Sequence, residues 1–353
     1  MTFGDRLKQA RVLSNLKQHE LAERVGVNKM SISKYETGKM MPSSSTLIAL
    51  SHALNVSLDY FFTETNVKLK SKPEFRLNGA DSILKDKTTV KITAQTEEAV
   101  SRHMEVLQIY PEETIPKVDP RLKRRVSNME DIENLAIQVR KKWELGLDPI
   151  ENLIDVAENH GFTIVLIDGD ANFDAAVFIE DEYGPIIALK HNTPKERQRF
   201  SLAHELGHYF IQCSASPTTT WNDETRSNRF AAALLIPRAL IMSDVGRKRT
   251  SFEKDELLIL REKYGVSISM LLNRMKSLDI ISAEIHEKYK QFDAKGDFKV
   301  KKEESEESKE YEKPRLIRKL VYRAVAEGVI SEQRGFELLG EDGGLGSRLG
   351  RTA

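Results

Sequence analysis

The 353 residues are enough for two or three domains, and a hydrophobic content of 40% supplies material for a sizeable core. The 54 Lys and Arg balance the 54 Asp and Glu, so any attraction for nucleic acid must be local to one part of the chain. The single cysteine, Cys213, excludes an internal disulfide, and no run approaches the roughly 20 apolar residues of a membrane span. We therefore expect a cytoplasmic protein without a signal peptide or a membrane segment.

Residues 4–62 predict five short helices, over Asp5–Ser14, Gln18–Val25, Lys29–Glu36, Ser45–Leu54 and Leu58–Phe62. Gly26 and Val27 make a tight turn between the second and third helices. Asn28 then caps the third helix, and Gly38 ends it. Two helices joined by a short glycine turn are typical of a DNA-binding helix-turn-helix. A helix-turn-helix used only for protein contacts is the alternative.

The run from Leu16 to Val27, the run from Ile32 to Lys39, and Pro42-Ser43 resemble the Xre/Cro repressor family. In that geometry the start of the second helix of the motif meets base edges, so we expect Lys29, Met30 and Lys34 in the groove. Gln18 is expected to anchor the first helix of the motif. Lys17 and Lys39 are expected to contact phosphates.

The predicted helix-turn-helix is only mildly basic. Over residues 4–62, eight Lys and Arg oppose five Asp and Glu, which leaves a net charge of +3. Affinity for a double-stranded DNA operator would therefore depend on two copies bound to half-sites one helical turn apart. We expect a homodimer.

The middle of the chain alternates between polar segments and regular structure. Residues 63–86 predict a linker with one short strand at 74–77, and residues 87–110 predict a long helix ended by a proline-rich stretch. Helices are expected over 131–145 and 149–160, followed by a strand at 162–167. Residues 175–179 and 185–189 then flank a turn and predict a β-hairpin. We expect an extended protein substrate to add to the hairpin edge near residues 185–190.

The sequence His204-Glu205-Leu206-Gly207-His208 is the strongest chemical signal. Positions four apart share a helix face, so His204 and His208 converge as a tetrahedral Zn²⁺ requires, and Glu205 is placed to take a proton from a water on that metal. Thr193-Pro194-Lys195-Glu196 predicts a capping box at the start of this helix, with Pro194 as its first residue. A third protein ligand is still needed. A second helix beginning near Trp221 offers Glu224, which shares a face with Asn228, or Asp223, which is otherwise the N-cap.

The run Arg199–His208, with Glu224, Ser227-Asn228, Phe230-Ala231 and Leu234–Pro237, resembles the ImmA/IrrE metallopeptidases, which are gluzincin-like zinc enzymes. The resemblance spans roughly residues 125–285. It implies that Glu224 is the third ligand and that the domain cleaves a protein regulator in a limited way. Ser227 replaces the usual alanine. No spacing selects an oxyanion-stabilising group among the candidates His191, Tyr209, Tyr264, His286 and Tyr289. Cys213 is expected to be a small core residue rather than a ligand.

Residues 254–281 predict helix, and residues 299–314 are almost free of apolar residues and predict a flexible linker. Leu316–Gly328 and Ser331–Leu339 predict a short helical pair before a glycine-rich, disordered tail. Such a pair could dock on the preceding domain or recognise a partner.

Together these features predict an α+β, mostly helical chain. It consists of a helix-turn-helix bundle (1–65), a linker and helix (66–125), a zincin-like peptidase domain with a small sheet (126–290), a charged linker (291–314) and a helical C-terminal segment (315–353). The function expected is a DNA-binding regulator that cleaves a protein partner or repressor. One alternative is an antitoxin-like repressor that neutralises a toxin without proteolysis. Another is a transcription factor that senses a metabolite in the zinc cleft.

Overall fold

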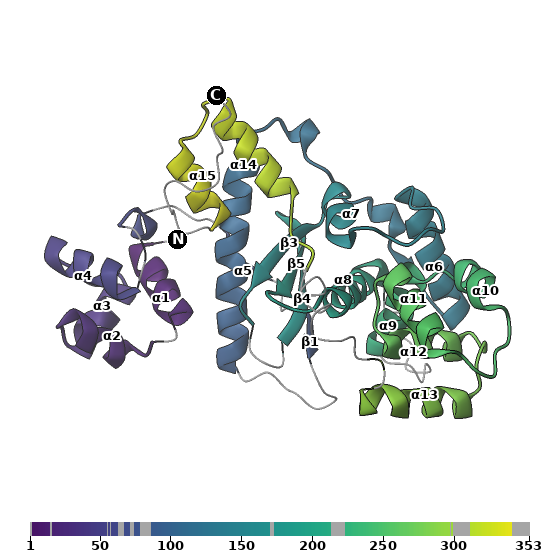
Figure 1. The fold of residues 1–353 in the computed structure, drawn as a ribbon. Coiled ribbons are helices and arrows are strands. Elements are labelled where there is room, and N and C mark those ends of the chain that lie inside the picture. Colours follow the sequence, from purple (N-terminus) through teal and green to yellow (C-terminus); the bar gives the residue numbers. More distant parts are fainter. Residues whose placement is uncertain are drawn as a thin grey trace, which may run out of the picture. The chain divides into compact units, whose positions relative to one another are not determined.

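The computed structural model describes residues 2–14, 16–54, 56, 58–62, 67–70, 74–77, 86–169, 173–212, 223–296, 298 and 311–340. The chain is mostly helical and divides into two compact units (Figure 1). The first unit comprises residues 1–70 and 83–106, and the second comprises residues 71–82 and 107–353. None of the described helices combines the length and the apolar character needed to cross a membrane.

The first unit begins with the predicted helical bundle, formed by α1 (Phe3–Leu13), α2 (Gln18–Val25), α3 (Lys29–Glu36), α4 (Ser44–Leu54) and the 3-10 turn η1 (Asp59–Phe61). Gly26 adopts a left-handed conformation with φ of 73° and ends α2. The Asn28 side chain accepts a hydrogen bond from the Ser31 amide and caps α3. Leu7, Leu21 and Ile32 pack together as the fully buried core of the bundle.

Helix α5 (Asp86–Leu107) packs with this bundle, whereas the sequence suggested a separate region over residues 66–125. The Arg6 guanidinium donates to Glu98 of α5 at 2.6 Å, and the Gln9 amide donates to the Ala94 carbonyl at 3.2 Å. Arg6 and Gln9 are both buried, so these contacts tie α1 firmly to α5.

The second unit contains a four-stranded sheet in the order β1-β4-β5-β3, formed by β1 (Glu74–Leu77), β3 (Thr163–Ile167), β4 (Phe173–Glu180) and β5 (Gly184–Lys190). β4 and β5 form the predicted antiparallel hairpin, and β3 pairs with β5 in parallel. Two-residue strands β2 (Arg124–Arg125) and β6 (Ile211–Gln212) pair in parallel elsewhere.

The prediction that a protein substrate adds to a free sheet edge near residues 185–190 is therefore wrong. β5 lies inside the sheet, with β4 on one side and β3 on the other, so both rows of its backbone groups are already paired. The edge strands of the described sheet are β1 and β3.

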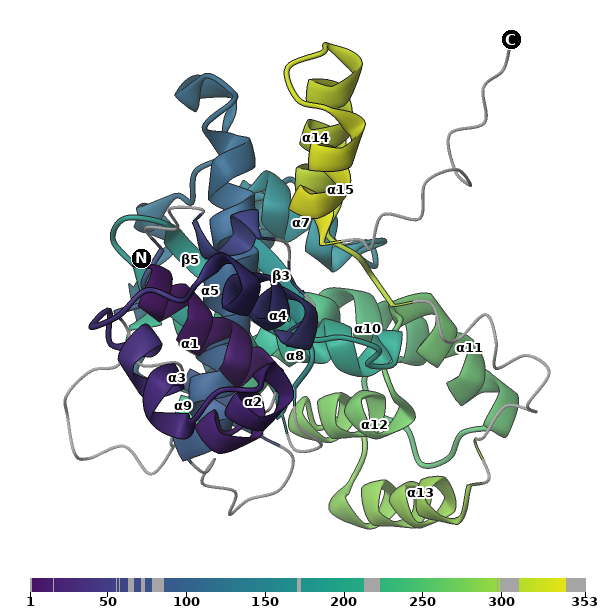
Figure 2. The ribbon, with the colours of Figure 1, turned by 90° about the vertical axis from the view of Figure 1, so that its left-hand side faces the viewer.

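Helices build one large core together with the sheet. They are α6 (Met129–Lys142), α7 (Leu153–Asn159), α8 (Lys195–Phe210), α9 (Asp223–Leu235), α10 (Arg238–Val245), α11 (Lys254–Tyr264), α12 (Ile268–Ser277) and α13 (Ala283–Lys295), with 3-10 turns at Glu112–Thr114 and Pro120–Leu122. α8 packs on β4 and β5 and runs beside α9 (Figure 1). α12 and α13 lie against each other (Figure 2). Phe210 and Phe230 meet in the core between α8 and α9.

The start of α8 differs from the predicted capping box. The N-cap is Pro194, without a side-chain cap, and the helix begins at Lys195. The Thr193 hydroxyl donates instead to the Lys190 carbonyl at 3.0 Å, at the end of β5. Thr193 thus closes the turn after the strand rather than the first turn of the helix.

The C-terminal helices α14 (Leu316–Ala326) and α15 (Glu332–Leu339) form the predicted pair and lie side by side (Figure 2). The Ser331 side chain caps α15 as expected. The predicted linker over 291–314 differs at both ends, because α13 continues to Lys295 and residues 311–314 dock onto the second unit. The intervening residues 299–310 and the predicted disordered tail after residue 340 lie outside the described residues.

Glu312 holds this docked segment in place. Its buried carboxylate pairs with Arg199 of α8 at 2.5 Å. It also accepts hydrogen bonds from the backbone amides of Leu153 and Ile154, the first two residues of α7. The Gln198 side chain bonds both the amide and the carbonyl of Glu312. The Glu312 side chain therefore satisfies the first two backbone amides of α7, a helix that lies far earlier in the sequence.

Candidate metal centre and DNA-binding surface

Three predicted ligands lie together at the crossing of α8 and α9. The Nε2 atoms of His204 and His208 are 2.9 Å apart, and the Glu224 carboxylate lies 3.2 Å from the first and 3.5 Å from the second. Within the described ranges these three residues form a group whose ligand atoms all lie within 4.8 Å of one another. Two imidazole nitrogens and a carboxylate are a donor set suited to a divalent metal such as zinc.

Helical spacing explains this convergence. His204 and His208 are one turn apart on α8, and Glu224 lies in the first turn of α9. Asp223, the competing candidate, is the first residue of α9, and its carboxylate forms an ion pair with the Arg226 guanidinium at 3.3 Å. The structure thus brings Glu224, rather than Asp223, to the two histidines.

Asn228 orients the first histidine. Its amide oxygen lies 2.9 Å from Nδ1 of His204, and it follows Glu224 by one turn on α9. An amide oxygen only accepts hydrogen bonds, so Nδ1 of His204 carries a proton, and Nε2 is the nitrogen that faces His208 and Glu224. The sequence placed Asn228 on the face of Glu224 without assigning it this role.

The side chains of the candidate site differ in their exposure to solvent. His204 and Glu205 are fully buried, whereas the Glu224 side chain is 51% exposed. Hydrogen bonds from His204 and His208 hold the pKa of the Glu224 carboxyl well below its usual range. The carboxylate therefore stays ionised near neutral pH and faces the exposed side of the group.

Gly207 allows α8 and α9 to approach each other. A Cβ atom added at this residue would lie 3.0 Å from the Cα of Ser227 and 3.2 Å from its Cβ. Small residues at both positions therefore set the distance between the helix that carries the histidines and the helix that carries Glu224.

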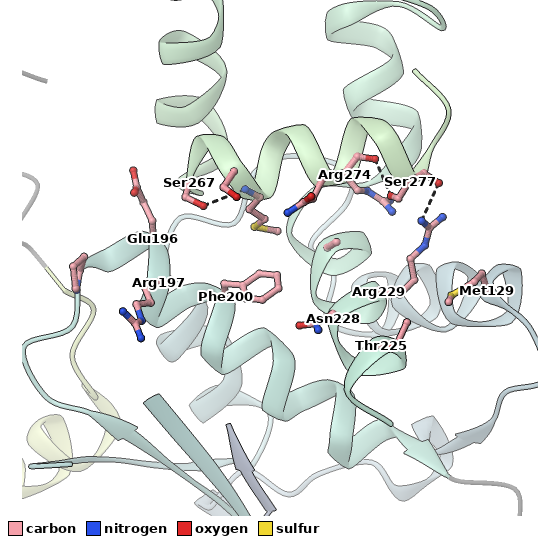
Figure 3. Close-up of a pocket in the computed structure, with 15 residues that line it drawn as sticks. Met129, Glu196, Arg197, Phe200, Thr225, Asn228, Arg229, Ser267, Arg274 and Ser277 are labelled. Carbon is pink, nitrogen blue, oxygen red and sulfur yellow. Dashed lines mark hydrogen bonds between the residues drawn. The ribbon is translucent and has the colours of Figure 1, made fainter. Parts of the chain in front are cut away.

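A cavity of about 790 Å³ lies on the Asn228 side of His204, between α8, α9 and α12. Phe200 projects into it with Asn228 alongside (Figure 3). The Phe200 ring centroid is 6.5 Å from that of His204. Arg229 and Arg274 also line the cavity, and both are paired with the buried Glu133. The cavity thus adjoins the residue that orients His204, and two of its cations share the single carboxylate of Glu133.

The five oxyanion candidates have other partners. Tyr289 bonds the backbone of Phe252, Tyr264 donates to Asp244, and His286 bonds Asn273. His191 bonds Tyr311, and Tyr209 packs against Phe162. These contacts are structural, and Cys213 lies outside the described residues.

The DNA-binding candidates lie on the surface of the first unit. Lys29, Lys34, Lys17 and Lys39 are exposed, and the Met30 side chain is 66% exposed. Gln18, at the start of α2, donates to Glu36 at 2.8 Å, so its amide is engaged within the bundle. The structure groups five of the six candidates as exposed side chains around α2 and α3.

Comparison with known proteins finds a family match for each of the two predicted domains. Residues 7–61 match the family described as helix-turn-helix, and residues 157–276 match the IrrE N-terminal-like domain. The chain is 34% identical over 93 residues to the HTH-type transcriptional regulator ImmR of Bacillus subtilis, which covers 26% of this chain and 73% of ImmR. It is 30% identical over 89 residues to the prophage-derived regulator YonR of the same organism, covering 24% of this chain and 82% of YonR.

The chain belongs to the Xre-type helix-turn-helix regulators and carries an IrrE-like domain. Among solved structures, the P22 c2 repressor in complex with a synthetic operator shares 34% sequence identity, with coverage of 17% of this chain and 92% of that chain and a TM-score of 0.17. The chain is thus a DNA-binding transcriptional regulator with an IrrE-like domain, and His204, His208 and Glu224 lie in that domain.

Proposed function

We propose that this regulator is also a zinc metallopeptidase that cleaves a protein partner, such as a repressor, in a limited way. The observation that carries the proposal is the convergence of His204, His208 and Glu224 within 4.8 Å, with the buried Glu205 next to His204 on the same helix. Two histidines and one carboxylate leave a fourth position open, as catalytic rather than structural zinc sites do.

Each residue has a distinct part in this proposal. His204, His208 and Glu224 hold Zn²⁺, and Asn228 fixes the ring of His204. When bound, Zn²⁺ supplies Lewis acidity that makes water more acidic and a peptide carbonyl more electrophilic. Glu205 takes a proton from the attacking water and later passes it to the leaving amine. The exposed side of Glu224 is the route by which a peptide reaches the group.

The first unit supplies the second half of the proposal. We propose that it binds a double-stranded operator as a homodimer in the cytoplasm, with Lys29, Met30 and Lys34 in the major groove. Lys17 and Lys39 contact phosphates, and Gln18 anchors the first helix of the motif to the DNA backbone or to a base. Support comes from the exposure of these lysines and from the P22 c2 repressor, whose structure was determined with operator DNA.

The phosphate contacts have a simple test. Binding to sheared double-stranded DNA is measured against salt concentration for Lys17→Ala, Lys39→Ala and Lys8→Ala, the last changing an exposed lysine of α1. Each of the first two changes should reduce the slope of log affinity against log salt by about 1 for each copy bound, because each copy loses one phosphate contact. Lys8→Ala should leave the slope unchanged. Equal slopes for all three variants would contradict the assignment.

Metal content tests the catalytic half. Inductively coupled plasma mass spectrometry of purified protein should find about one zinc per chain in the wild type and less in Glu224→Ala, because one of three ligands is removed. Asp223→Ala is the matched control at the neighbouring carboxylate and should retain zinc. No zinc in the wild type, even after zinc is supplied, would end the peptidase proposal.

Glu205→Gln separates cleavage from binding. This variant keeps the three ligands but removes the carboxylate that moves the proton. Control of the partner should be lost in the variant if the chain is a peptidase. Control that survives would favour the antitoxin-like repressor, which binds its partner without cutting it. An operator shift that depends on a small ligand would favour the metabolite sensor.

A further inference from the structure

The segment before α6 carries a dense group of positive charges. Over residues 117–125, five Lys and Arg oppose one Asp, which leaves a net charge of +4. The helix-turn-helix reaches only +3 over residues 4–62. Lys142, at the end of α6, joins the group because its ammonium lies 3.7 Å from the Asp119 carboxylate. We call six cations of the second unit the basic strip: Lys117, Arg121, Lys123, Arg124, Arg125 and Lys142.

The core of the second unit holds the backbone of the basic strip. Leu122 and Val126 are buried in that core, and residues 124–125 form β2, which pairs with β6 after the end of α8. The Asp119 side chain accepts a hydrogen bond from the Arg121 amide and caps the 3-10 turn between them and β2. The cations therefore extend from a fixed backbone, and little chain entropy is lost when a partner binds them.

Two carboxylates pair with part of the basic strip. Asp119 is shared by Arg121, at 2.9 Å, and Lys142. Glu112 pairs with Lys117 at 2.6 Å, and both of these side chains are exposed. Exposed ion pairs contribute little free energy, so a polyanion can replace them. Two negative charges thus face six positive ones.

The other three cations, Lys123, Arg124 and Arg125, have no ion pair with an acid among the residues that the structure describes. The Arg124 guanidinium donates to the backbone carbonyls of Arg121 and Lys123. The Lys123 ammonium lies 4.1 Å from the centre of the Tyr209 ring. Arg124 and Arg125 are both exposed. Positive charge that is not compensated at a surface attracts a polyanion, over about 10 Å at 0.1 M salt.

The composition of the basic strip favours a nucleic acid over a protein partner. Protein interfaces are centred on apolar or aromatic anchors, and charged residues are depleted there. Both aliphatic side chains within residues 117–125, Val118 and Leu122, contact the core instead. Arginine binds phosphate through paired hydrogen bonds, and double-stranded DNA carries one negative charge about every 1.7 Å along its axis.

DNA is also the polyanion that this regulator binds through its helix-turn-helix. α5 packs with that bundle and ends at Leu107, and Lys117 follows ten residues later. Ten residues span at most about 36 Å. DNA held by the first unit is therefore present at high effective concentration for the basic strip.

We propose that the basic strip is a second DNA-binding surface, which contacts the phosphates of double-stranded DNA without reading its sequence. Phosphate contacts raise affinity by releasing counterions, and the helix-turn-helix alone has little net charge for this purpose. The proposal rests on DNA binding by the chain. It requires neither zinc nor cleavage of a partner.

Salt titration of DNA binding tests the proposal. Full-length chain is titrated with sheared double-stranded DNA, and Arg124→Gln with Arg125→Gln removes two charges while the amides of β2 remain. The slope of log affinity against log salt should fall by about 2 for each copy bound, because two phosphate contacts are lost. Lys288→Gln with Lys290→Gln, at two exposed positions of α13, is the matched control and should leave the slope unchanged.

Equal slopes in the two double variants would overturn the proposal. Folding of both is checked by cooperative urea unfolding, followed through tryptophan fluorescence, in which Trp143 reports on the core of the second unit. Vesicles of phosphatidylserine and phosphatidylcholine are measured in parallel. If removal of the two arginines abolished vesicle binding but left the DNA slope unchanged, the basic strip would belong to a membrane surface and the proposal would fail.

Acetylation of lysines in the wild-type chain gives a readout that needs no variant. The Lys117 and Lys142 side chains are 68% and 53% exposed, so acetic anhydride should modify both. Added DNA should reduce modification of these two lysines, measured by mass spectrometry, but not of Lys288 and Lys290. Modification of Lys117 and Lys142 that DNA leaves unchanged would overturn the proposal. Lys17 is measured in the same digest, so a wrong assignment within the helix-turn-helix is recognised separately.

Discussion

At the residue scale, the candidate metal centre depends on side chains that hold other side chains. Asn228 does not lie within the group of three ligands, but its amide oxygen fixes which nitrogen of His204 faces Glu224. Outer contacts of this kind fix the orientation of a ligating histidine and raise its basicity. The spacing of Glu224 and Asn228 showed that they share a helix face, but only the fold shows that this face meets His204.

Asn228→Ala should therefore weaken zinc binding without removing a ligand. We expect an affinity loss of about 10-fold to 100-fold, because the His204 ring loses its fixed orientation. The measurement is competition for zinc with a fluorescent chelator. Asn273→Ala is the matched control, since Asn273 lines the same cavity and bonds a different histidine, His286. A similar loss in both variants would mean that the cavity, and not the bond to His204, is responsible.

At the element scale, the ends of helices could be predicted from a few adjacent residues, whereas the pairing partners of the strands could not. Asn28, Gly26 and Ser331 act where the sequence indicated, because a cap or a left-handed turn is decided by a few adjacent residues. The hairpin of β4 and β5 was also predicted. Its surroundings were not, because β3 and β1 join it through pairings that no local pattern encodes.

The crossing of α8 and α9 can be tested through Gly207. Alanine is favoured over glycine within a helix by about 1 kcal/mol, but the new Cβ would press on Ser227, and such overpacking costs about 1–3 kcal/mol. The two effects nearly offset each other, so stability should change little while α9 shifts and carries Glu224 away from the histidines. We expect zinc affinity to fall about tenfold, which corresponds to about 1.4 kcal/mol.

Chelator competition and urea unfolding measured on the same sample separate these effects. Ser227→Ala is the control, because it changes the other side of the crossing without adding bulk. Unchanged zinc affinity in a stable Gly207→Ala variant would show that the helix spacing tolerates the methyl group.

At the scale of the whole molecule, the second unit is closed by its own C-terminal segment. The backbone amides of Arg315 and Leu316 donate hydrogen bonds to the Glu158 carboxylate on α7, and Glu312 lies three residues before Arg315. In sequence, Glu312 is one of many charged residues in a stretch that composition predicts to be flexible. Its burial beside Arg199 could not be predicted from the local sequence, because it depends on residues more than 100 positions away.

This contact should make stability depend on pH. Burial raises the pKa of Glu158 from 4.5 to about 7, despite the two amides that favour its charged form. A carboxyl with a raised pKa in the folded state contributes stability that is fully present below pH 4.5 and is lost as the pH rises through about 7. With about 1.4 kcal/mol for each pH unit, the loss between pH 4.5 and pH 8 is on the order of 2–3 kcal/mol.

Glu158→Gln removes this titration and keeps an acceptor for the two amides. Urea unfolding followed by tryptophan fluorescence at pH 5 and at pH 8 should show a smaller decrease in stability for the variant than for the wild type. An identical decrease in both would mean that Glu158 does not titrate in this range.

The bond from Glu312 to the start of α7 also sets an order in time. Leu153 and Ile154 leave the ribosome long before their acceptor, which follows 159 and 158 residues later. At a synthesis rate of about 5–20 residues per second, this delay is on the order of ten to thirty seconds. Throughout that interval the Leu153 and Ile154 amides of α7 lack their carboxylate acceptor, and Arg199 lacks its anionic partner. The IrrE-like domain can therefore be completed only after residue 312 has been made.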